Sequence, residues 1–355
     1  MRLRKLKRKL KLENKIPYLI SDLHNIKYLT GFNGTYAYLV IDEKKSYFIS
    51  DSRYEEHIRS ILPGSFKFIL QEEELKKTLK SLLNKIGCNR IFVEEHSMPL
   101  STFNELKRGL RGIRLISASN EVNTLRMIKD DLEVTKLKKA ASITDKCFNH
   151  IIKFIKPGMK EWDIAVEIEF FYKKNGCRSV SFDPIVASGK MSSMPHYETS
   201  ISKKIKKGDV ILIDMGCIYD EYNSDLTRTI FVNSIDPEIE KIYTIVREAQ
   251  ERSISFVKPG ITTGKLDSIA RNYINDMGYG GRFGHSLGHS LGLEVHEIPA
   301  VKKDGETNIK KNMVLTVEPG IYVPNLGGVR IEDMVLVTSR GYDVLTKSSK
   351  DIIVI

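Results

Sequence analysis

The chain has few cysteines and no long apolar run. Its 4 cysteines among 355 residues are scattered, with no CxxC pair and no zinc-ribbon spacing, which favours reduced thiols over disulfides or a structural zinc site. No apolar stretch approaches the roughly 18–20 residues that a membrane-spanning helix needs. The basic start also lacks the uninterrupted apolar core of a secretory signal. We therefore expect a cytoplasmic protein that does not enter a membrane.

The net charge of +11 is concentrated at the start of the chain. Residues 1–15 carry eight Lys or Arg against Glu13, so they hold +7 of this charge and the other 340 residues hold only +4. Leu3, Leu6 and Leu10 recur at helical spacing, which predicts an amphipathic helix with a solvated basic face. An acidic partner or nucleic acid is the alternative use of this segment, but we expect no nucleic-acid binding.

The chain is long enough to favour two domains, and its sequence pattern changes near residue 125. Strand patterns occur at residues 17–22, 36–42, 46–51, 66–70 and 90–95, and a helical pattern at 72–87 separates the last two. They predict an α/β domain with a mixed sheet at 1–124. A long helical pattern follows from about residue 125 and ends at Lys156-Pro157-Gly158, which opens a second domain at 125–355.

The second domain contains an internal repeat, because residues 154–177 resemble residues 256–280. Three landmarks recur 102 residues apart, pairing Pro157 with Pro259, Gly158 with Gly260 and Gly176 with Gly278. Each copy reads as a helix end, a Pro-Gly turn, a second helix and a glycine stop, with strands following. Two such halves predict an α+β domain with pseudo-two-fold symmetry and a site between the halves.

Two predicted hairpins bring acidic side chains together. In residues 207–232, a turn centred on Tyr219-Asp220 would place Asp214 directly opposite Asp225, roughly 4.5–5.5 Å away at Cβ. Such carboxylates repel unless a proton or a cation lies between them. An aspartate within VILIDMG is also costly to bury without a partner.

The second hairpin spans residues 313–338, and a turn centred on Asn325 would place Glu318 opposite Glu332. A chance register or one arm of a salt bridge could explain either acid pair alone. Two pairs together with FGHSLGHSLGLEVHE at 283–297 indicate metal. Four carboxylates and one imidazole suit two divalent ions of manganese, cobalt or iron better than a structural zinc site.

These residues, in this order and spacing, resemble the pita-bread metallopeptidases, and within them the Xaa-Pro aminopeptidase and Xaa-Pro dipeptidase (prolidase) group. The resemblance covers nearly the whole chain. NIKYLTGFNG is similar to the amino-terminal domain of this group, and the catalytic-domain motifs are SFDPIVASGK, ILIDMG, SLGHSLGLEVHE, TVEPGIY and GGVRIED. The resemblance implies an α/β amino-terminal domain followed by a pita-bread catalytic domain.

The resemblance also implies a ligand set for two divalent ions, with manganese expected and cobalt, iron or zinc as alternatives. Asp225 and Glu332 would bridge the ions, Asp214 would complete one coordination sphere, and His289 and Glu318 the other. A hydroxide held between the metals would attack the scissile carbonyl, and Glu318 would carry a proton to the leaving nitrogen.

Four further residues gain roles from the resemblance. His296 would face the substrate and help to stabilise the tetrahedral intermediate, with His196 opposite it, and His285 matches a further active-site histidine. Arg330 matches an arginine that positions Glu332 or a nearby carboxylate. Without the family, His296 reads as a hydrogen-bonded packing residue and Arg330 as an exposed strand residue.

We expect an Xaa-Pro aminopeptidase that acts on peptides with proline at the second position, and a homodimer. Several prolidases carry Arg soon after the HE of the last histidine motif, where this chain has Ala300 in HEIPAV. A prolidase restricted to dipeptides is therefore the alternative. A binding protein that has lost catalysis is a further alternative, against which the intact ligand set argues.

Overall fold

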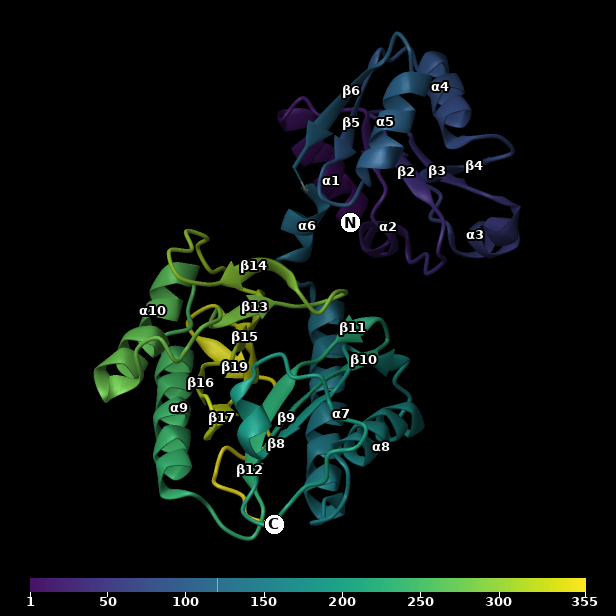
Figure 1. The fold of residues 1–355 in the computed structure, drawn as a ribbon. Helices are drawn as coiled ribbons and strands as arrows, with labels where there is room; N and C mark the ends of the chain where they lie inside the picture. The colour runs from purple at the N-terminus through teal and green to yellow at the C-terminus, as the bar shows by residue number, and fades with distance from the viewer. Residues whose placement is uncertain (120) are drawn as a thin grey trace. The chain divides into compact units, whose positions relative to one another are not determined.

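The computed structural model describes residues 1–119 and 121–355, and the chain divides into two compact units, Met1–Arg126 and Met127–Ile355 (Figure 1). The predicted domain boundary after residue 124 lies two residues before this division. The 4 cysteines form no disulfide. Among the helices of the described ranges, none combines the length and the apolar character that a membrane crossing requires.

The first unit is built on a six-stranded mixed sheet of order β4-β3-β2-β1-β5-β6, as the strand pattern predicts. Its strands are β1 (Tyr18–Ile20), β2 (Tyr38–Ile41), β3 (Ser46–Ser50), β4 (Phe66–Leu70), β5 (Arg90–Glu94) and β6 (Arg114–Ala118). Its helices are α1 (Arg2–Leu12), α2 (Leu23–Thr30), α3 (Glu55–Ile61), α4 (Leu75–Lys85), α5 (Leu100–Gly109) and α6 (Glu121–Arg126). Strand β6 was not predicted from the sequence, because it is a short edge strand of which only Ala118 is buried.

Helix α1 buries its apolar stripe, since Leu6 and Leu10 are fully buried. Its basic face is only partly solvated, contrary to the prediction. Lys9 Nζ lies 2.7 Å from Glu121 Oε2, and Lys15, just after the helix, pairs with the other oxygen of the same carboxylate. Part of the basic excess therefore holds α1 against α6.

The second unit has four long helices, α7 (Asp131–Phe154), α8 (Glu161–Lys174), α9 (Pro237–Ser255) and α10 (Thr263–Ile274). Its strands are β7 (Ser179–Val180), β8 (Ile185–Ser188), β9 (Val210–Met215), β10 (Cys217–Tyr219), β11 (Tyr222–Asn223), β12 (Leu226–Phe231), β13 (Gly288–Ser290), β14 (Glu297–Val301), β15 (Val314–Val317), β16 (Gly320–Val323), β17 (Gly327–Arg330), β18 (Asp333–Val337) and β19 (Tyr342–Val344). In Figure 1, α7 and α8 lie on one side of these strands and α9 and α10 on the other.

Helix α7 begins later than its periodic pattern suggests. Asp130 caps it by accepting a hydrogen bond from the backbone of Glu133, whose side chain accepts one from the backbone of Asp130. This reciprocal capping box satisfies two otherwise unpaired amides, and so it sets the start at Asp131.

The internal repeat is a repeat of structure. Gly158 and Gly260 both adopt φ 93°, a left-handed conformation that glycine reaches without a Cβ penalty. The Gly158 amide donates to the Ile205 carbonyl at 2.9 Å, and the Gly260 amide donates to the Ile309 carbonyl at 2.9 Å. The pseudo-two-fold domain predicted from the repeat is confirmed.

Each half has its own core. Ile211 and Ile213 of β9 pack with α7 and α8, and Leu315 and Val317 of β15 pack with α9 and α10. Since side chains alternate along a strand, the intervening positions point away from the helices. The faces turned away from the two helix layers therefore carry Asp214 on β9 and Thr316 on β15.

Candidate metal centre

The first acidic hairpin does not have the predicted register. Asp214 of β9 lies opposite Thr227 of β12 rather than opposite Asp225. The turn is Asp220-Glu221, where both residues have positive φ (44° and 71°), so its centre lies one residue further along than predicted. Positive φ at both central residues is the type I′ geometry that suits the twist of a hairpin.

The corrected register moves the partner of Asp214 by two residues. Because side chains alternate with a period of two, Asp225 stays on the same face as Asp214, diagonal to it instead of across from it. The two carboxylates are still close enough that Asp214 contributes to raising the pKa of Asp225.

The second acidic hairpin has the predicted register. Val317 pairs with Asp333 and Gly320 pairs with Arg330. Both pairs are centred on residue 325, where the hairpin turns, so Glu318 and Glu332 lie across from each other between the paired strands. This register prediction is confirmed.

His289 faces the acidic residues from β13. Its Nδ1 donates to the Ser290 carbonyl at 3.1 Å, which leaves Nε2 as the lone-pair nitrogen, 3.5 Å from both Asp225 Oδ2 and Glu318 Oε1. Burial, reinforced by His296, lowers the pKa of His289 to about 4, so the imidazole is neutral. A neutral imidazole with a free Nε2 is the form that binds metal.

The glycine before this histidine is needed for the close packing of two strands. A Cβ at Gly288 would lie 2.1 Å from the carbonyl oxygen of Thr316. The glycine-rich composition of residues 283–297 thus has one definite structural reason, which is that β13 and β15 approach each other closely beside His289.

The acidic groups form a buried cluster that fits cations. Asp225, His289 and Glu332 each present a ligand atom within 4.8 Å of the other two. Burial and the neighbouring carboxylates Asp214 and Glu318 raise the pKa of Asp225 well above its usual range, and burial and Asp225 do the same for Glu332. Divalent cations would remove this repulsion.

Two more carboxylates complete the cluster. Burial raises the pKa of Glu318 to about 8, against the opposing effect of Arg330. Asp214 Oδ1 is buried and has no hydrogen-bond partner within the described ranges. A buried carboxylate oxygen is rarely left in this state, and a metal ion would satisfy it.

Arg330 is a buried residue of β17, not an exposed one. Its Nη2 donates to Asp214 Oδ2, its Nε donates to Thr227 Oγ1 at 3.0 Å, and its Nη1 donates to the Tyr322 hydroxyl at 2.9 Å. The resemblance left two possible partners for Arg330, either Glu332 or another carboxylate nearby. In the structure the partner is another carboxylate, Asp214.

His285 joins the same network through Tyr322. Its Nδ1 donates to the Ser286 carbonyl at 2.8 Å, and its Nε2 accepts from the Tyr322 hydroxyl at 2.9 Å. Burial, with a further contribution from Arg330, lowers the pKa of His285 to about 4. His285 is therefore a neutral residue at the edge of the cluster that contacts Arg330 through Tyr322.

His296 and His196 lie at the open side of the cluster, and both are exposed. The His296 ring centroid is 4.4 Å from that of His289, in an edge-on arrangement. Partial burial of the ring lowers the pKa of His296, Asp214 opposes this shift and His196 adds to it, so both residues lie near it. Because His296 is exposed, it is not the hydrogen-bonded packing residue that its sequence alone would suggest.

Three residues at the cluster were not singled out from the sequence. Thr227 Oγ1 donates to Glu332 Oε2 at 2.7 Å, and Thr316 Oγ1 donates to Glu318 Oε1 at 3.2 Å. The third is Tyr322, whose motif TVEPGIY was noted without a role for the tyrosine. The two threonines had a usable signal, because each stands two residues from a predicted ligand and so shares its face of the strand.

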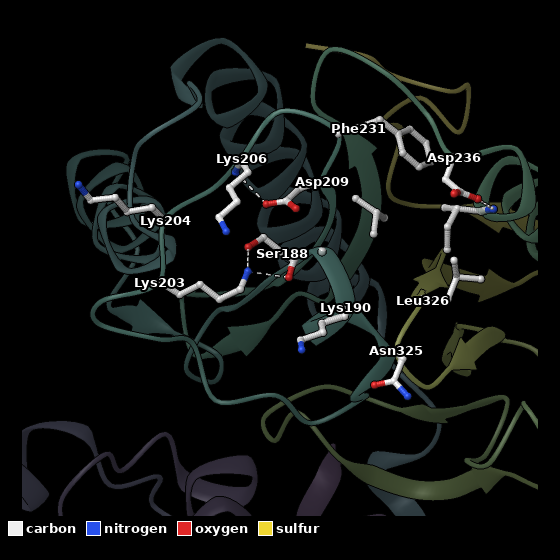
Figure 2. Close-up of a pocket in the computed structure, with 14 residues that line it drawn as sticks. Ser188, Lys190, Lys203, Lys204, Lys206, Asp209, Phe231, Asp236, Asn325 and Leu326 are labelled. Atoms are coloured by element: carbon white, nitrogen blue, oxygen red, sulfur yellow. Dashed lines mark hydrogen bonds between the residues drawn. The ribbon is translucent and has the colours of Figure 1, made fainter.

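A cavity of about 600 Å³ lies elsewhere in the second unit. Val210 and Phe231, at the ends of β9 and β12 remote from Asp214 and Asp225, form part of its lining. Figure 2 shows Lys203 on its wall with hydrogen bonds to Ser188, one of them to the carbonyl oxygen at 2.7 Å. No predicted ligand or catalytic residue lines this cavity, so it is separate from the acidic cluster.

Comparison with known proteins agrees with this geometry. Residues 135–339 match the model of metallopeptidase family M24, and residues 2–128 match the creatinase/prolidase N-terminal domain. An Xaa-Pro dipeptidase of Pyrococcus horikoshii is 39% identical over 340 residues, covering 94% of this chain and 93% of that protein.

Two solved structures show the same fold over essentially the whole chain. An Xaa-Pro dipeptidase from Bacillus anthracis has a TM-score of 0.96 at 38% identity and covers 100% of this chain and 99% of its own. An X-Pro aminopeptidase from Thermotoga maritima has a TM-score of 0.88 at 36% identity, covering 98% and 100%. On the matched domains and the acidic cluster together, this chain belongs to metallopeptidase family M24.

Proposed function

We propose that the protein is a dinuclear-metal-dependent Xaa-Pro dipeptidase, a prolidase. The observation that carries the proposal is the buried cluster of four carboxylates and His289 in a chain of family M24. Similarity over the whole chain to proteins named Xaa-Pro dipeptidase favours the dipeptidase over the aminopeptidase that is preferred on sequence grounds. That preference rested on Ala300 alone, an exposed residue of β14.

Asp214, Asp225, His289, Glu318 and Glu332 would hold the two ions, for which we propose manganese. When bound, the ions would polarise the scissile carbonyl and lower the pKa of a bound water. The oxygen-rich set with a single neutral imidazole is the support for manganese over a structural zinc ion.

The protein's own residues supply the remaining steps. Glu318, whose carboxylate already accepts a hydrogen bond from Thr316, would carry a proton from the attacking water to the leaving nitrogen. His296 and His196, on the open side, would donate to the oxygen on which negative charge develops. Arg330 would hold the orientation of Asp214.

The preference for proline has a chemical reason. An Xaa-Pro bond is a tertiary amide that has no N–H, and its ring fixes φ. Peptidases that bind a substrate through this N–H handle the bond poorly. A site that acts on the carbonyl and the amino-terminal residue does not need it.

A panel of peptides with added manganese, cobalt, iron or zinc tests the proposal. Xaa-Pro dipeptides should be cleaved with at least about tenfold higher kcat/KM than Xaa-Pro-Yaa tripeptides, a difference of about 1.4 kcal/mol in transition-state binding. Faster cleavage of tripeptides would instead support the aminopeptidase. Bound metal without cleavage of any Xaa-Pro peptide would support the non-catalytic binding protein.

The roles of the two neighbouring histidines are tested separately. His296→Ala should keep both metals and lose about 10²–10³-fold in kcat, because it removes a donor to developing charge. Metal analysis of the purified variant is the control. If His296→Ala loses the metals, the roles proposed for His289 and His296 are exchanged.

The homodimer implied by the resemblance is part of the proposal. Light scattering of the purified protein should give twice the mass of 40.5 kDa. A monomer that hydrolyses Xaa-Pro peptides would contradict the proposed dimer but not the proposed peptidase activity.

A further inference from the structure

We propose that Lys129 and Glu297 form a buried ion pair that positions His296, so that both are positioning residues of the peptidase. This inference rests on the proposed function, because it concerns the rate of that reaction. Neither residue belongs to the ligand set, and neither is among the residues predicted from the sequence.

The pair is almost completely buried. Lys129 Nζ lies 3.0 Å from Glu297 Oε2, and the two side chains are only 1% and 5% exposed. The same ammonium donates to Ser290 Oγ at 3.3 Å. Lys129 therefore contacts the residue that follows the ligand His289 and the residue that follows His296.

The backbone of Lys129 is fixed by hydrogen bonds to Asn312. Its backbone N–H donates to the Asn312 carbonyl at 2.8 Å, and Asn312 Nδ2 donates to the Lys129 carbonyl at 3.0 Å. Asn312 also donates from its backbone to the Val337 carbonyl at the end of β18. These hydrogen bonds fix Lys129 to the same sheet that carries His289.

The loop between the two histidines folds around the carboxylate of Glu297. Glu297 Oε1 accepts hydrogen bonds from the backbone of Leu293 at 2.9 Å and of Glu294 at 3.3 Å. At Gly292 a Cβ would lie 2.8 Å from this oxygen, so a larger residue there would displace the carboxylate from the loop. One carboxylate thereby shapes the loop with one oxygen and binds Lys129 with the other.

The loop has a second attachment beside another predicted ligand. Asn223 donates to the Gly292 carbonyl from its backbone at 2.8 Å and from Nδ2 at 3.0 Å. Asn223 stands two residues before Asp225. The loop that ends at His296 is consequently tied to both halves of the domain.

Stability alone is a poor explanation of this pair. An apolar pair of similar volume generally stabilises a protein as well as a buried ion pair does. The ion pair adds direction, because the ammonium donates to fixed acceptors on both strands that flank the loop, Ser290 on β13 and Glu297 on β14. Directional hydrogen bonds next to a functional group are what fix its geometry.

The central experiment uses the double variant Lys129→Met with Glu297→Gln, which leaves no unpaired charge in the interior. The variant should keep two metals and its KM within about threefold, while kcat falls about 10–100-fold, the usual loss when a group supporting a site is removed. Hydrogen exchange of the backbone amides of residues 291–296 should become faster. Lys129→Arg, which keeps the charge, should recover part of kcat.

A double-mutant cycle separates positioning from general destabilisation. On the His296→Ala background the double variant should cause no further loss of kcat, because the residue through which it acts is gone. The matched control is Lys138→Met, which removes a lysine from an exposed ion pair with Asp343 and should change neither rate nor exchange.

Three results would overturn the inference: an unchanged kcat, a loss that adds in full to that of His296→Ala, or an unchanged exchange of residues 291–296. Failure of the proposed function is distinguishable. In that case the unmodified protein with manganese hydrolyses no Xaa-Pro peptide, whereas hydrogen exchange still reports whether the ion pair orders the loop.

Discussion

Three carboxylates of the candidate metal centre accept a hydrogen bond from a side chain, two of them from another strand and Glu318 from Thr316 at the end of its own strand. Glu332 accepts from Thr227 at 2.7 Å, Glu318 accepts from Thr316 at 3.2 Å, and Asp214 accepts from Arg330. For Asp225, as for Glu332, the strongest influences on the pKa after burial are neighbouring carboxylates, which raise it. The negative charge of these two side chains would therefore depend strongly on a bound cation.

Asp225→Asn should abolish metal binding at one site at least and lower kcat/KM by about 10³-fold or more, because a neutral amide neither bridges two cations nor balances their charge. Without metal, the variant should be at least as stable as the unmodified protein at pH 7, since the amide removes buried repulsion. Metal analysis, peptide assays and urea unfolding check both statements.

The matched control is Asp220→Asn at the tip of the same hairpin, where asparagine tolerates the positive φ of 44°. It should keep metal and activity. Full activity and two bound metals in Asp225→Asn would remove Asp225 from the ligand set.

Glu94 gives the first unit a pH dependence of its own. It is fully buried at the end of β5, and burial raises its pKa to about 7, although the backbone amides of Asp22 and Ser21 donate to it. With an unfolded value near 4.5, its contribution to stability is fully present below about pH 4.5 and is lost as pH rises through about 7. The loss amounts to about 3 kcal/mol.

Glu94→Gln should therefore gain stability relative to the unmodified protein as pH rises from 5 to 8, because the amide does not ionise. Urea unfolding of the first unit across this range measures the difference. Glu95→Gln, at the exposed neighbouring position, is the control and should show no such trend. A difference that stays constant with pH would mean that Glu94 is already ionised at pH 5.

At the scale of elements, the two hairpins show how turn geometry decides which acids meet. The hairpin of β16 and β17 turns at Asn325, where asparagine adopts φ 66°, and this position was readable from Pro324-Asn325-Leu326. The turn at Asp220-Glu221 needs positive φ at a glutamate, a residue with no preference for it. That turn was therefore placed one residue too early.

The repeated Pro-Gly turns predict equal effects from equal changes. Gly158→Ala and Gly260→Ala should each destabilise the second unit by about 1–2 kcal/mol. Both glycines have φ 93°, and a Cβ at either would meet no atom within 4 Å. Only backbone strain therefore contributes to the loss of stability. Urea unfolding measures the loss. Gly341→Ala, with equal space and no positive φ, should change stability by less than about 0.5 kcal/mol. Clearly unequal effects at the two turns would show that the halves are not equivalent there.

At the scale of the whole molecule, the proposed ligands come from both halves of the repeat. Asp214 and Asp225 belong to the first half, and His289, Glu318 and Glu332 to the second. The backbone N–H of Glu332 donates to the Thr227 carbonyl at 3.1 Å, so the two halves are also hydrogen-bonded at the cluster. Metal binding should consequently hold the halves together.

Removal of metal should therefore lower the stability of the second unit. At a free manganese concentration 100-fold above Kd, each site contributes about 2.7 kcal/mol. For a unit of this size, each kcal/mol corresponds to about 2–4 °C in Tm. Calorimetry with manganese against a chelator measures the shift in Tm, and Asp225→Asn should show a smaller shift, because it lacks at least one of the two sites. An equal Tm in both conditions would argue against a centre shared by the halves.

Much of this protein was readable from its sequence because the signals are local. The mixed sheet follows from short apolar runs, the repeat from Pro-Gly turns 102 residues apart, and the register of the second hairpin from the composition of its turn. The buried position of the acidic residues was also readable, because an acid within an apolar strand needs a partner wherever the strand lies.

Tertiary structure alone decided which groups meet across long separations. It paired Arg330 with Asp214, 116 residues away, and Lys129 with Glu297, 168 residues away. It also moved Asp225 from a position across from Asp214 to a diagonal one. Such contacts depend on how sheets and helices pack on one another, and no periodicity or spacing in the chain encodes that packing, because it is settled by the burial of many side chains at once.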